Sequence, residues 1–436
     1  MIIDRKYFLV IGLLTFSITA MGNDFINFTW QATYAPKEIG ITTTKGKFFA
    51  IKWGENSAVD TITGTDSIHT IYHFYNYYGS PSNPVFFTVN IEALSSDCRF
   101  SAFDCRFGLI TVLETNCSAL THLDCSSNRL SELEINECIA LEYLNCDYNS
   151  LIILDLTKNI VLRELRCSWN QLTTLELNNN PNLTVIGCGY NQLRVLDVTK
   201  NIALEILGCD YNQLSVLDVT KNLKLWSLGY SNNQINVLDL NPNMESMVLG
   251  CPYNHLQLSD LYNISEMMKN ATYKCLGTQK LVPIQTKTGD PIDFSSQKEF
   301  GDVTSVFVIE KDSMSAIIGV EYTIDKGIII FERTGNYTIT MTNSAINSDW
   351  YPAEVIVDIH VSGVGVVDAE QIFDIQPYPN PTTGKVFLST ESNIKVYNMQ
   401  GMFLQEIFGK EIDLSVYPQG MYLLQINGMI KKISRN

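Results

Sequence analysis

The sequence has few basic residues for its length. Among 436 residues, 30 lysines and arginines stand against 46 aspartates and glutamates, which gives a formal net charge of −16. A nucleic-acid partner requires clustered Lys and Arg to neutralise its phosphates. No basic stripe occurs in the chain, so we expect no nucleic-acid partner.

Histidine is also scarce, and catalytic motifs are missing from the sequence. His69 and His73 have a spacing that a metal-binding pair uses, but no third ligand and no HExxH context accompany them. The sequence contains no nucleophile elbow, phosphate-binding loop or zinc motif. We therefore predict no catalytic residue, no metal site and no cofactor. The three remaining histidines are scattered at positions 122, 255 and 360.

Apolar runs long enough to cross a membrane are absent. The only sizeable run covers residues 8–18, after Arg5 and Lys6, and small residues at Ala20 and Gly22 then form a signal peptidase site. A membrane-spanning helix needs ~20 apolar residues, more than this run offers. We interpret residues 1–22 as a signal peptide and expect a mature chain outside the cytoplasm with no transmembrane span.

Eleven cysteines in an exported chain would normally suggest disulfides. Stacked strands are ~4.8 Å apart, however, which is wider than the ~3.8 Å between Cβ atoms that a disulfide prefers. We predict buried thiols in the repeat and leave the disulfide state of Cys98 and Cys275 open. The main column has a period of 21 residues, with Tyr230 in the one turn without cysteine, and consists of Cys125, Cys146, Cys167, Cys188, Cys209 and Cys251.

Internal repetition is the strongest feature of the sequence. One unit runs Leu141-x-x-Leu144-x-Cys146-x-x-Asn149-x-Leu151-x-x-Leu154-Asp155-Leu156-x-x-Asn159. The alternation of Leu with Leu or Cys predicts a short strand, and the Asn predicts a turn in which its amide bonds to the backbone. Stacked copies form a parallel sheet with a continuous core. The turn asparagines recur every 21 residues, at Asn128, Asn149, Asn170, Asn191, Asn212, Asn233 and Asn254.

This pattern resembles the leucine-rich-repeat family in its short, internalin-like form, with little or no helix on the convex side. Residues 141–151 match the eleven-residue core motif of that family, with Cys146 in a Leu column. The resemblance covers residues 98–260. It implies a curved solenoid whose concave sheet binds proteins or glycans.

Two strand-rich regions flank the repeat, so we expect a mostly β protein in which small β-sandwiches flank the solenoid. Residues 24–95 resemble the PKD-type β-sandwich through Trp53-Gly54-Glu55-Asn56-Ser57, His73-Phe74-Tyr75 and Phe87-Thr88-Val89. We expect this region to serve also as the N-terminal cap of the solenoid. Residues 275–362 resemble bacterial immunoglobulin-like modules through Gly335-Asn336-Tyr337-Thr338-Ile339. Such modules usually act as spacers. A helix-like stretch near Ser259 predicts a C-terminal cap that includes residues 261–274.

Residues 370–436 contain three ordered motif blocks. They resemble the type A sorting domain of the type IX secretion system. The resemblance implies passage through the periplasm and across an outer membrane by the type IX machinery, cleavage before the domain, and release or attachment at the cell surface. The residues that carry the motifs are Tyr378, Pro379, Asn380, Pro381, Gly384, Gly401, Gly420, Tyr422 and Lys432.

The candidate ligand-binding residues lie on and beside the predicted strands. An aromatic residue precedes the turn Asn in several units and can stack on sugars or anchor a protein partner. In the alternative interpretation these rings only pack against one another and cover the turn. The strands themselves are expected to present polar side chains outward near the N-terminus and a Gly column further on. The candidates are Tyr148, Trp169, Tyr190, Tyr211, Tyr143, Glu164 and Arg166.

The second half of each unit carries an acidic column. We expect Lys158, Lys200 and Lys221, each three residues further along, to compensate three of these charges. A calcium column is the less favoured alternative, because each turn lacks multiple carboxylates. The column consists of Glu134, Asp155, Glu176, Asp197, Asp218 and Asp239.

These features together predict an exported leucine-rich-repeat protein that is secreted or held at the cell surface. Its expected role is binding or adhesion, through recognition of a protein or glycan on the concave face of the solenoid. Two alternatives remain open. One is an enzymatic role, either as an accessory of a surface glycan-processing enzyme or through a site in the N-terminal sandwich, and the other is a structural spacer without a ligand.

Overall fold

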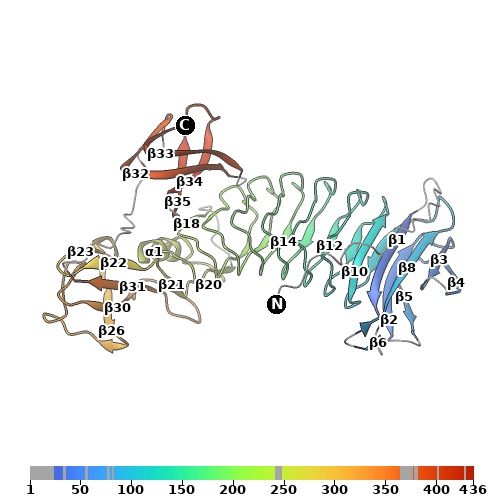
Figure 1. Ribbon diagram of the computed structural model, residues 1–436, viewed down its shortest axis with the longest axis horizontal. Coiled ribbons are helices and arrows are strands. Elements are labelled where there is room, and N and C mark those ends of the chain that lie inside the picture. Colours follow the sequence, from blue (N-terminus) through green and yellow to red (C-terminus); the bar gives the residue numbers. More distant parts are fainter. Residues whose placement is uncertain are drawn as a thin grey trace.

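A computed structural model describes residues 24–32, 36–54, 57–75, 79–80, 83–240, 248–363, 377, 382–399, 402–426 and 429–436. The predicted signal peptide at residues 1–22 lies outside these ranges. Figure 1 shows a long array of stacked coils with a β-rich region at each end and a small β-domain beside the C-terminal part of the array. No helix in the described ranges is long and apolar enough to cross a membrane.

The N-terminal region is a sandwich that shares one sheet with the solenoid. Its outer sheet has the order β10-β1-β8-β3-β4, and β10 comes from residues beyond the predicted boundary near 95–98. Its inner sheet continues directly into the concave sheet of the solenoid, because β2 pairs with both β5 and β9. The ranges 24–95 and 98–260 therefore form one packed body. The strands are β1 (Phe25–Gln31), β2 (Lys37–Thr43), β3 (Phe48–Lys52), β4 (Val59–Thr63), β5 (His69–His73), β6 (Gly79–Ser80), β7 (Asn83–Pro84), β8 (Phe86–Ala93), β9 (Phe100–Asp104) and β10 (Ile110–Asn116).

The solenoid has a parallel concave sheet of three-residue strands in the predicted register. Leu144 of one turn lies beside Leu123 of the turn before and Leu165 of the turn after, a step of 21 residues. Among the described residues, the convex side of the regular turns carries two short paired strands, β16 (Val216–Asp218) and β18 (Val237–Asp239). The concave strands are β11 (His122–Asp124), β12 (Tyr143–Asn145), β13 (Glu164–Arg166), β14 (Val185–Gly187), β15 (Ile206–Gly208), β17 (Ser227–Gly229), β19 (Val248–Gly250) and β20 (Tyr273–Cys275).

Buried Leu and Cys columns form the core of the solenoid. One apolar cluster runs from Ile26 in the N-terminal sandwich to Val361 at the far end. All eleven cysteines are buried and free, Cys98 and Cys275 included, which confirms the prediction of buried thiols. Burial raises the pKa of Cys188 and Cys251 to about 12, so these thiols stay neutral at physiological pH.

The C-terminal end of the solenoid is covered by α1 (Leu258–Met267) and a second β-rich region. The backbone N–H of Gln257 donates to Asp260 Oδ2 at 2.9 Å, so the start of α1 is fixed by a capping box. The backbone N–H of Lys274 in β20 donates to Asp349 Oδ2 at 2.8 Å, which ties this region to the last solenoid strand. Its elements are β21 (Thr278–Lys280), β22 (Ile284–Lys287), β23 (Pro291–Asp293), η1 (Ser295–Gln297), β24 (Glu299–Phe300), β25 (Val303–Thr304), β26 (Val306–Lys311), β27 (Met314–Ser315), β28 (Tyr322–Asp325), β29 (Ile328–Phe331), β30 (Gly335–Thr342) and β31 (Glu354–Ser362).

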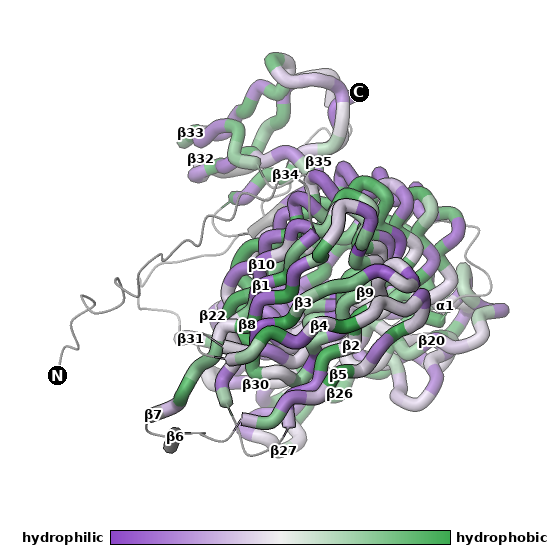
Figure 2. Tube along the Cα trace, turned by 90° about the vertical axis from the view of Figure 1, so that its right-hand side faces the viewer, coloured by the Kyte–Doolittle hydropathy of each residue, from purple (hydrophilic) through white to green (hydrophobic). Residues whose placement is uncertain are grey.

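The C-terminal domain has a core of its own. Its four strands, β32 (Lys385–Asn398), β33 (Phe403–Asp413), β34 (Gly420–Ile426) and β35 (Met429–Arg435), form a sheet in the order β33-β32-β34-β35. Their buried side chains make an apolar cluster separate from that of the solenoid. Figure 2 shows this domain projecting from one side of the stacked coils. The separate core is what a domain that folds on its own requires.

Candidate ligand-binding face

The concave strands present two outward columns of side chains. In each three-residue strand the central residue is buried, and the first and third residues reach solvent to different degrees. The first column begins with His122, Tyr143 and Glu164 and continues with aliphatic residues at Val185 and Ile206. The third column changes from Asp, Asn and Arg to four successive glycines. The face therefore has a polar half and a bare half.

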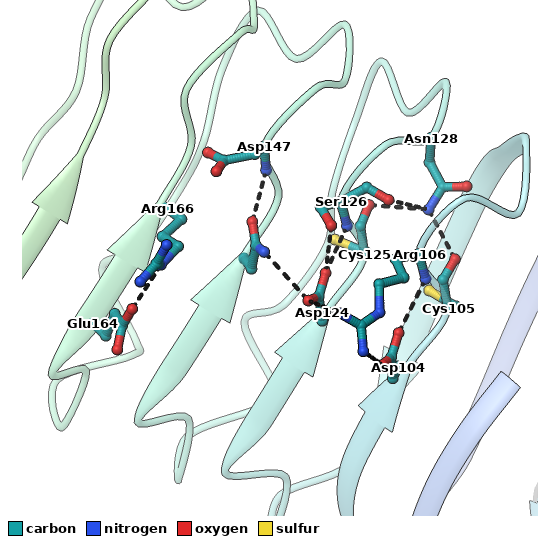
Figure 3. A network of polar contacts seen from close by, with 11 residues as sticks. Asp104, Cys105, Arg106, Asp124, Cys125, Ser126, Asn128, Asp147, Glu164 and Arg166 are labelled. Carbon is teal, nitrogen blue, oxygen red and sulfur yellow. Dashed lines mark hydrogen bonds and ion pairs between the residues drawn. The ribbon is translucent and has the colours of Figure 1, made fainter. Parts of the chain in front are cut away.

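The first three turns of the polar half carry a connected network of charged and polar side chains (Figure 3). Arg106 lies between two carboxylates, with Nη2 at 2.7 Å from Asp104 Oδ2 and Nη1 at 3.9 Å from Asp124 Oδ2. Asp124 also accepts a 3.2 Å hydrogen bond from Asn145 Nδ2 of the next turn. Neighbouring carboxylates raise the pKa of Arg106, Asp104 most of all, which holds the guanidinium in its charged form. The network crosses three turns.

The following turn extends this polar surface, and two rings lie beside the network on its own strands. Arg166 Nε donates to Glu164 Oε1 at 2.6 Å within one strand. The rings of His122 and Tyr143 stack with centroids 5.8 Å apart. Burial, with a smaller contribution from the Asp124 charge, raises the pKa of Tyr143, so its hydroxyl stays a hydrogen-bond donor. The predicted residues Tyr143, Glu164 and Arg166 thus lie together on the concave face.

The bare half consists of Gly187, Gly208, Gly229 and Gly250. A Cβ placed on Gly208 would meet nothing within 4 Å, and one on Gly250 would meet only Ser231 Oγ at 3.7 Å. The exception is Gly229, where a Cβ would come within 2.7 Å of Asp210 Oδ2. A glycine inside a strand costs ~0.5–1 kcal/mol relative to alanine. Packing therefore does not account for most of this column.

The aromatic residues form a stacked ladder at one corner of the coils. Ring centroids are 5.3 Å apart for Tyr148 and Trp169, 3.7 Å for Trp169 and Tyr190, and 4.1 Å for Tyr190 and Tyr211, with nearly parallel planes. The ladder remains partly exposed along its length. Inner ring faces cover one another, so mainly ring edges and the two end faces are open to a ligand. The rings therefore pack against one another with their faces, as the alternative interpretation of the sequence has it. Contact of a ligand with the ring edges stays a prediction.

Four carboxylates of this region, in two pairs with similar surroundings, were not predicted as site residues from the sequence. Asp104 and Asp124 of the network were hidden because one lies in an atypical 20-residue turn and the other in a column that then changes to Asn and Arg. Asp147 and Asp210 each precede an aromatic ladder residue and accept a hydrogen bond from the backbone of the next turn, at Ser168 and Ser231. Burial raises the pKa of both carboxyls. The sequence feature that could have indicated Asp147 and Asp210 is their shared position directly before Tyr148 and Tyr211.

The convex acidic column is stabilised differently from the expected pairing with lysine. Asp155 Oδ1 accepts hydrogen bonds from the backbone N–H and hydroxyl of Thr157, at 2.9 and 2.7 Å. Asp197 and Asp218 have the same contacts with a threonine two residues further on. Lys158 only adds a minor electrostatic effect that lowers the pKa of Asp155. A short local turn satisfies these carboxylates more directly than a flexible Lys side chain.

Several sorting-motif residues can be placed in the C-terminal sheet. Tyr422 is buried and donates its hydroxyl proton to Pro418 O at 2.5 Å. This bond fixes the turn that leads into β34, whose first residue is Gly420. A Cβ on Gly384 would approach Ser415 Cβ to 3.0 Å, so this position favours glycine. Lys432 Nζ lies 3.7 Å from Asp218 Oδ2 of the solenoid. The motif residues Tyr378, Pro379, Asn380, Pro381 and Gly401 lie outside the described residues.

The stacked 21-residue turns define a leucine-rich-repeat solenoid, and a separate C-terminal sheet follows it. Residues 376–436 match the family model described as the secretion system C-terminal sorting domain. This domain implies the type IX machinery and brings the chain to the cell surface or outer membrane. The chain is therefore a secreted surface protein of the leucine-rich-repeat type.

Similar solved structures are themselves leucine-rich-repeat or internalin-type proteins. A leucine-rich-repeat protein of Leptospira interrogans has a TM-score of 0.34 and 19% identity, over 38% of this chain and 45% of that one. The functional domain of InlJ from Listeria monocytogenes, which includes a cysteine ladder, has a TM-score of 0.23 and 19% identity, over 60% and 90%. InlP from Listeria monocytogenes has a TM-score of 0.34 and 20% identity, over 57% of this chain and 67% of that one.

The present chain thus spans less than half of the Leptospira protein. No curated protein matches the sequence.

Proposed function

We propose that this surface protein binds a protein partner through the concave face of its solenoid. The observation that carries the proposal is the division of this face into a charged network and a glycine floor that packing, except at Gly229, does not require. Together the two halves supply what a protein interface needs, namely polar groups that fix orientation and a flat apolar area that can be desolvated.

The polar half supports recognition of a partner with charged side chains. Arg106 and Arg166 are both half-exposed and are held by carboxylates of the same face. Ordered charges of both signs favour one docking geometry and disfavour others, because like charges that meet across an interface are costly. Arg166, at the end of the polar half, is the residue that borders the glycine floor.

The bare half supports a close approach of the partner. Gly208 and Gly250 have room for a side chain. The first-column residues beside the glycines are Val185, Ile206, Ser227 and Val248, of which three are aliphatic. A strand glycine without a packing reason typically marks a place where a ligand or another backbone comes close. A protein side chain or main chain fits such a floor better than a glycan, whose hydroxyls need polar partners.

A binding role is also favoured over a catalytic one. Among the described residues, no group of three or more His, Cys, Asp or Glu side chains is arranged to hold a metal ion. The cysteines are buried, and the concave carboxylates are engaged with arginine, asparagine or backbone groups. We infer that the chain recognises its partner and does not transform it.

The test compares two variants of the face with a control on the convex side. Gly208→Leu should fill the floor without unfolding the solenoid, because the added Cβ meets no neighbour within 4 Å. Arg166→Ala removes the charge beside the floor, and Arg194→Ala removes an exposed arginine outside it. Partners are first identified with parallel arrays of surface proteins and glycans, and the affinities of the chain starting at Asn23 are then measured.

We expect a protein partner whose affinity falls at least tenfold with either face variant, since truncation of a central anchor typically costs ~2 kcal/mol. Arg194→Ala should bind like the unchanged chain. Binding only to glycans, or equal affinity for all three variants, would contradict the proposal. Thermal melts of the variants verify that loss of binding is not loss of fold.

A further inference from the structure

A second surface feature lies outside the concave face. One apolar residue per turn protrudes where the coil returns from its convex side to the next concave strand. Four of these residues are isoleucine or leucine, with side chains between 54% and 66% exposed, and the fifth is an exposed proline. We call this column the apolar ridge. Its members, spaced by 21 residues, are Ile139, Ile160, Pro181, Ile202 and Leu223.

The ridge is held rigidly by the residue that precedes each member. In four turns that residue is a fully buried asparagine, at positions 159, 180, 201 and 222. Asn180 Nδ2, for example, donates to Leu156 O at 3.1 Å and to Asn159 O at 2.9 Å in the turn before. Because the asparagine points inward, the next side chain points outward. The fold therefore fixes the direction of each ridge side chain but does not require it to be apolar.

Exposed apolar residues that occur singly are ordinary on a protein surface, whereas a contiguous row indicates an interaction site. Five stacked turns at a strand spacing of ~4.8 Å make a row about 20 Å long and one side chain wide. Val161 lies next to Ile160 and is also exposed. The pocket lined by Thr174 and Arg194 and the pocket lined by Tyr337 and His360 contain no ridge residue.

Lysines accompany the ridge on a chain that is otherwise acidic. Lys158, Lys200 and Lys221 each lie two residues before a ridge residue, across the buried asparagine, and Lys224 follows Leu223 closely. All four are exposed. The acidic side chains nearest in sequence are Glu137, Glu205 and Glu142, and Glu142 pairs with Arg163 at 3.5 Å.

The convex aspartates are directed to another part of the turn. Asp155, Asp197 and Asp218 lie five residues before the ridge and accept hydrogen bonds from local threonines. In the turns of Ile160, Ile202 and Leu223 the lysines are therefore the charges nearest to the apolar tips in sequence, and the turn of Pro181 has asparagines at the positions around its ridge residue.

This combination fits a soft anionic surface better than a second copy of the chain. A stable protein interface needs about 800 Å² from each partner, which a row one side chain wide does not provide. Two ridges packed together would also bring their lysine columns into opposition. A protruding row can instead insert among lipid headgroups, while Lys side chains extend to the phosphates.

We propose that the apolar ridge is a membrane-contact edge that binds anionic phospholipid. The sorting domain brings the chain to the cell surface or outer membrane, so a membrane is within reach of the ridge. Contact along one lateral edge leaves the concave face open, so both surfaces can be occupied together. The proposal goes beyond partner binding by the concave face, and either can fail without the other.

The experiment measures binding to vesicles made of equal parts phosphatidylglycerol and phosphatidylcholine, and to vesicles of phosphatidylcholine alone. The protein is the chain starting at Asn23, since the apolar residues before it would themselves enter lipid. The ridge variant is Ile160→Ser with Ile202→Ser. The matched control is Ile152→Ser with Ile153→Ser, which removes two isoleucines of 53% and 72% exposure outside the ridge.

We expect the unchanged chain and the control to co-sediment with anionic vesicles, and the ridge variant to bind roughly 20-fold more weakly because two inserted apolar side chains are lost. Lys158→Gln, Lys200→Gln and Lys221→Gln combined should weaken binding and reduce its dependence on salt. All variants change exposed residues, so their melting curves should match that of the unchanged chain.

Four results would overturn the proposal. The first is no binding of the unchanged chain to anionic vesicles, and the second is equal loss in the ridge and control variants. The third is a concentration-dependent dimer, seen by analytical ultracentrifugation without lipid, that the ridge variant abolishes, which would assign the ridge to a second copy. Equal binding by the triple lysine variant would refute the anionic headgroup as the partner.

Discussion

The two corners of each solenoid coil use the same residue in different ways. At the corner where the concave strand ends, Asn170 donates from Nδ2 to carbonyls of Cys146, Cys167 and Ser168, and its Oδ1 accepts from the backbone N–H of Leu151 at 3.0 Å. At the corner where the coil returns, Asn180 donates from Nδ2 only. No donor among the described residues reaches its buried Oδ1.

The difference shows what each corner must hold. The first corner carries the aromatic ladder, and its residues have left-handed backbone conformations, with φ of 57° at Trp169 and 53° at Tyr190. Such a backbone is unfavourable for residues other than glycine by ~1–2 kcal/mol, so the corner needs a fully bonded clamp and stacked rings. No described residue of the second corner has such a backbone, and a partly satisfied asparagine is enough to fix the ridge.

The aspartates near the two corners also differ in burial and in the direction of their pKa shifts. Asp210 at the aromatic corner is partly buried, and burial raises its pKa, although Ser231 donates to it. Asp155, near the returning corner, is exposed, and the hydrogen bonds from Thr157 lower its pKa. The same residue type therefore opposes folding at one corner and favours it at the other when it is ionised.

The largest effect that separates the corners should come from removal of the asparagines. Asn170→Ala leaves the buried N–H of Leu151 without its acceptor and removes three donated bonds, so we expect a loss of ~3 kcal/mol in the free energy of unfolding. Asn180→Ala removes two donated bonds and also an unpaired acceptor, so its loss should be ~1 kcal/mol. Denaturant unfolding of the two variants measures the difference directly.

Asn191→Ala and Asn201→Ala repeat the comparison one turn further along, where the same two patterns of bonds recur. The two pairs should agree, because each coil contacts mainly its neighbours. Equal losses at both corners would mean that the returning asparagine has a partner, such as a bound water, that completes its bonding.

The solenoid itself was predictable from the sequence because its signal is periodic. The Leu, Cys and Asn columns fix strand register to the residue, and the outward positions of Tyr143, Glu164 and Arg166 follow from alternation alone. The C-terminal sorting domain was identified in the same way, from motif blocks that the family model over residues 376–436 matches.

Features that depend on contacts between units were not predictable from the same reasoning. The sharing of a sheet through β2 and β9 is set by tertiary pairing, which local patterns do not encode. The link between Arg106 and Asp124 joins an irregular first turn to a regular one. The apolar ridge was not predicted for another reason. Its residues recur with the period of the repeat, and the core pattern alone does not tell which recurring apolar residues are exposed.

A smaller effect concerns the aromatic corner alone. Tyr190 is stacked on both sides, whereas Tyr253 has the same left-handed backbone, with φ of 60°, and no stacked ring among the described residues. Asparagine tolerates this backbone and occupies the same column at Asn232. We expect Tyr190→Asn to cost ~1 kcal/mol through lost stacking, and Tyr253→Asn to stabilise the fold by a few tenths, about 0.5 kcal/mol at most.

Thermal melts of both variants decide whether stacking offsets the backbone strain. If Tyr253→Asn destabilised the fold as much as Tyr190→Asn, the rings would stabilise the corner by covering the turn and not by stacking on one another.

The smallest effect, and the one with opposite signs, is the pH dependence at the two corners. The raised pKa of Asp210 means that its contribution to stability falls as pH rises above its ordinary value of 3.8, because the folded state then holds a proton that the unfolded state has released. Asp210→Asn keeps an oxygen for the Ser231 N–H and should be more stable than the unchanged chain at neutral pH, with the gap closing below about pH 3.8.

The lowered pKa of Asp155 gives the reverse expectation. Its stabilising effect is present above the ordinary value and is lost as pH falls, so Asp155→Asn should be slightly less stable than the unchanged chain at neutral pH and equal to it in acid. Melting temperatures of both variants and the unchanged chain across this pH range measure the two gaps. Gaps of the same sign would show that the two carboxylates experience the same environment, and the distinction between the corners would then not extend to their charges.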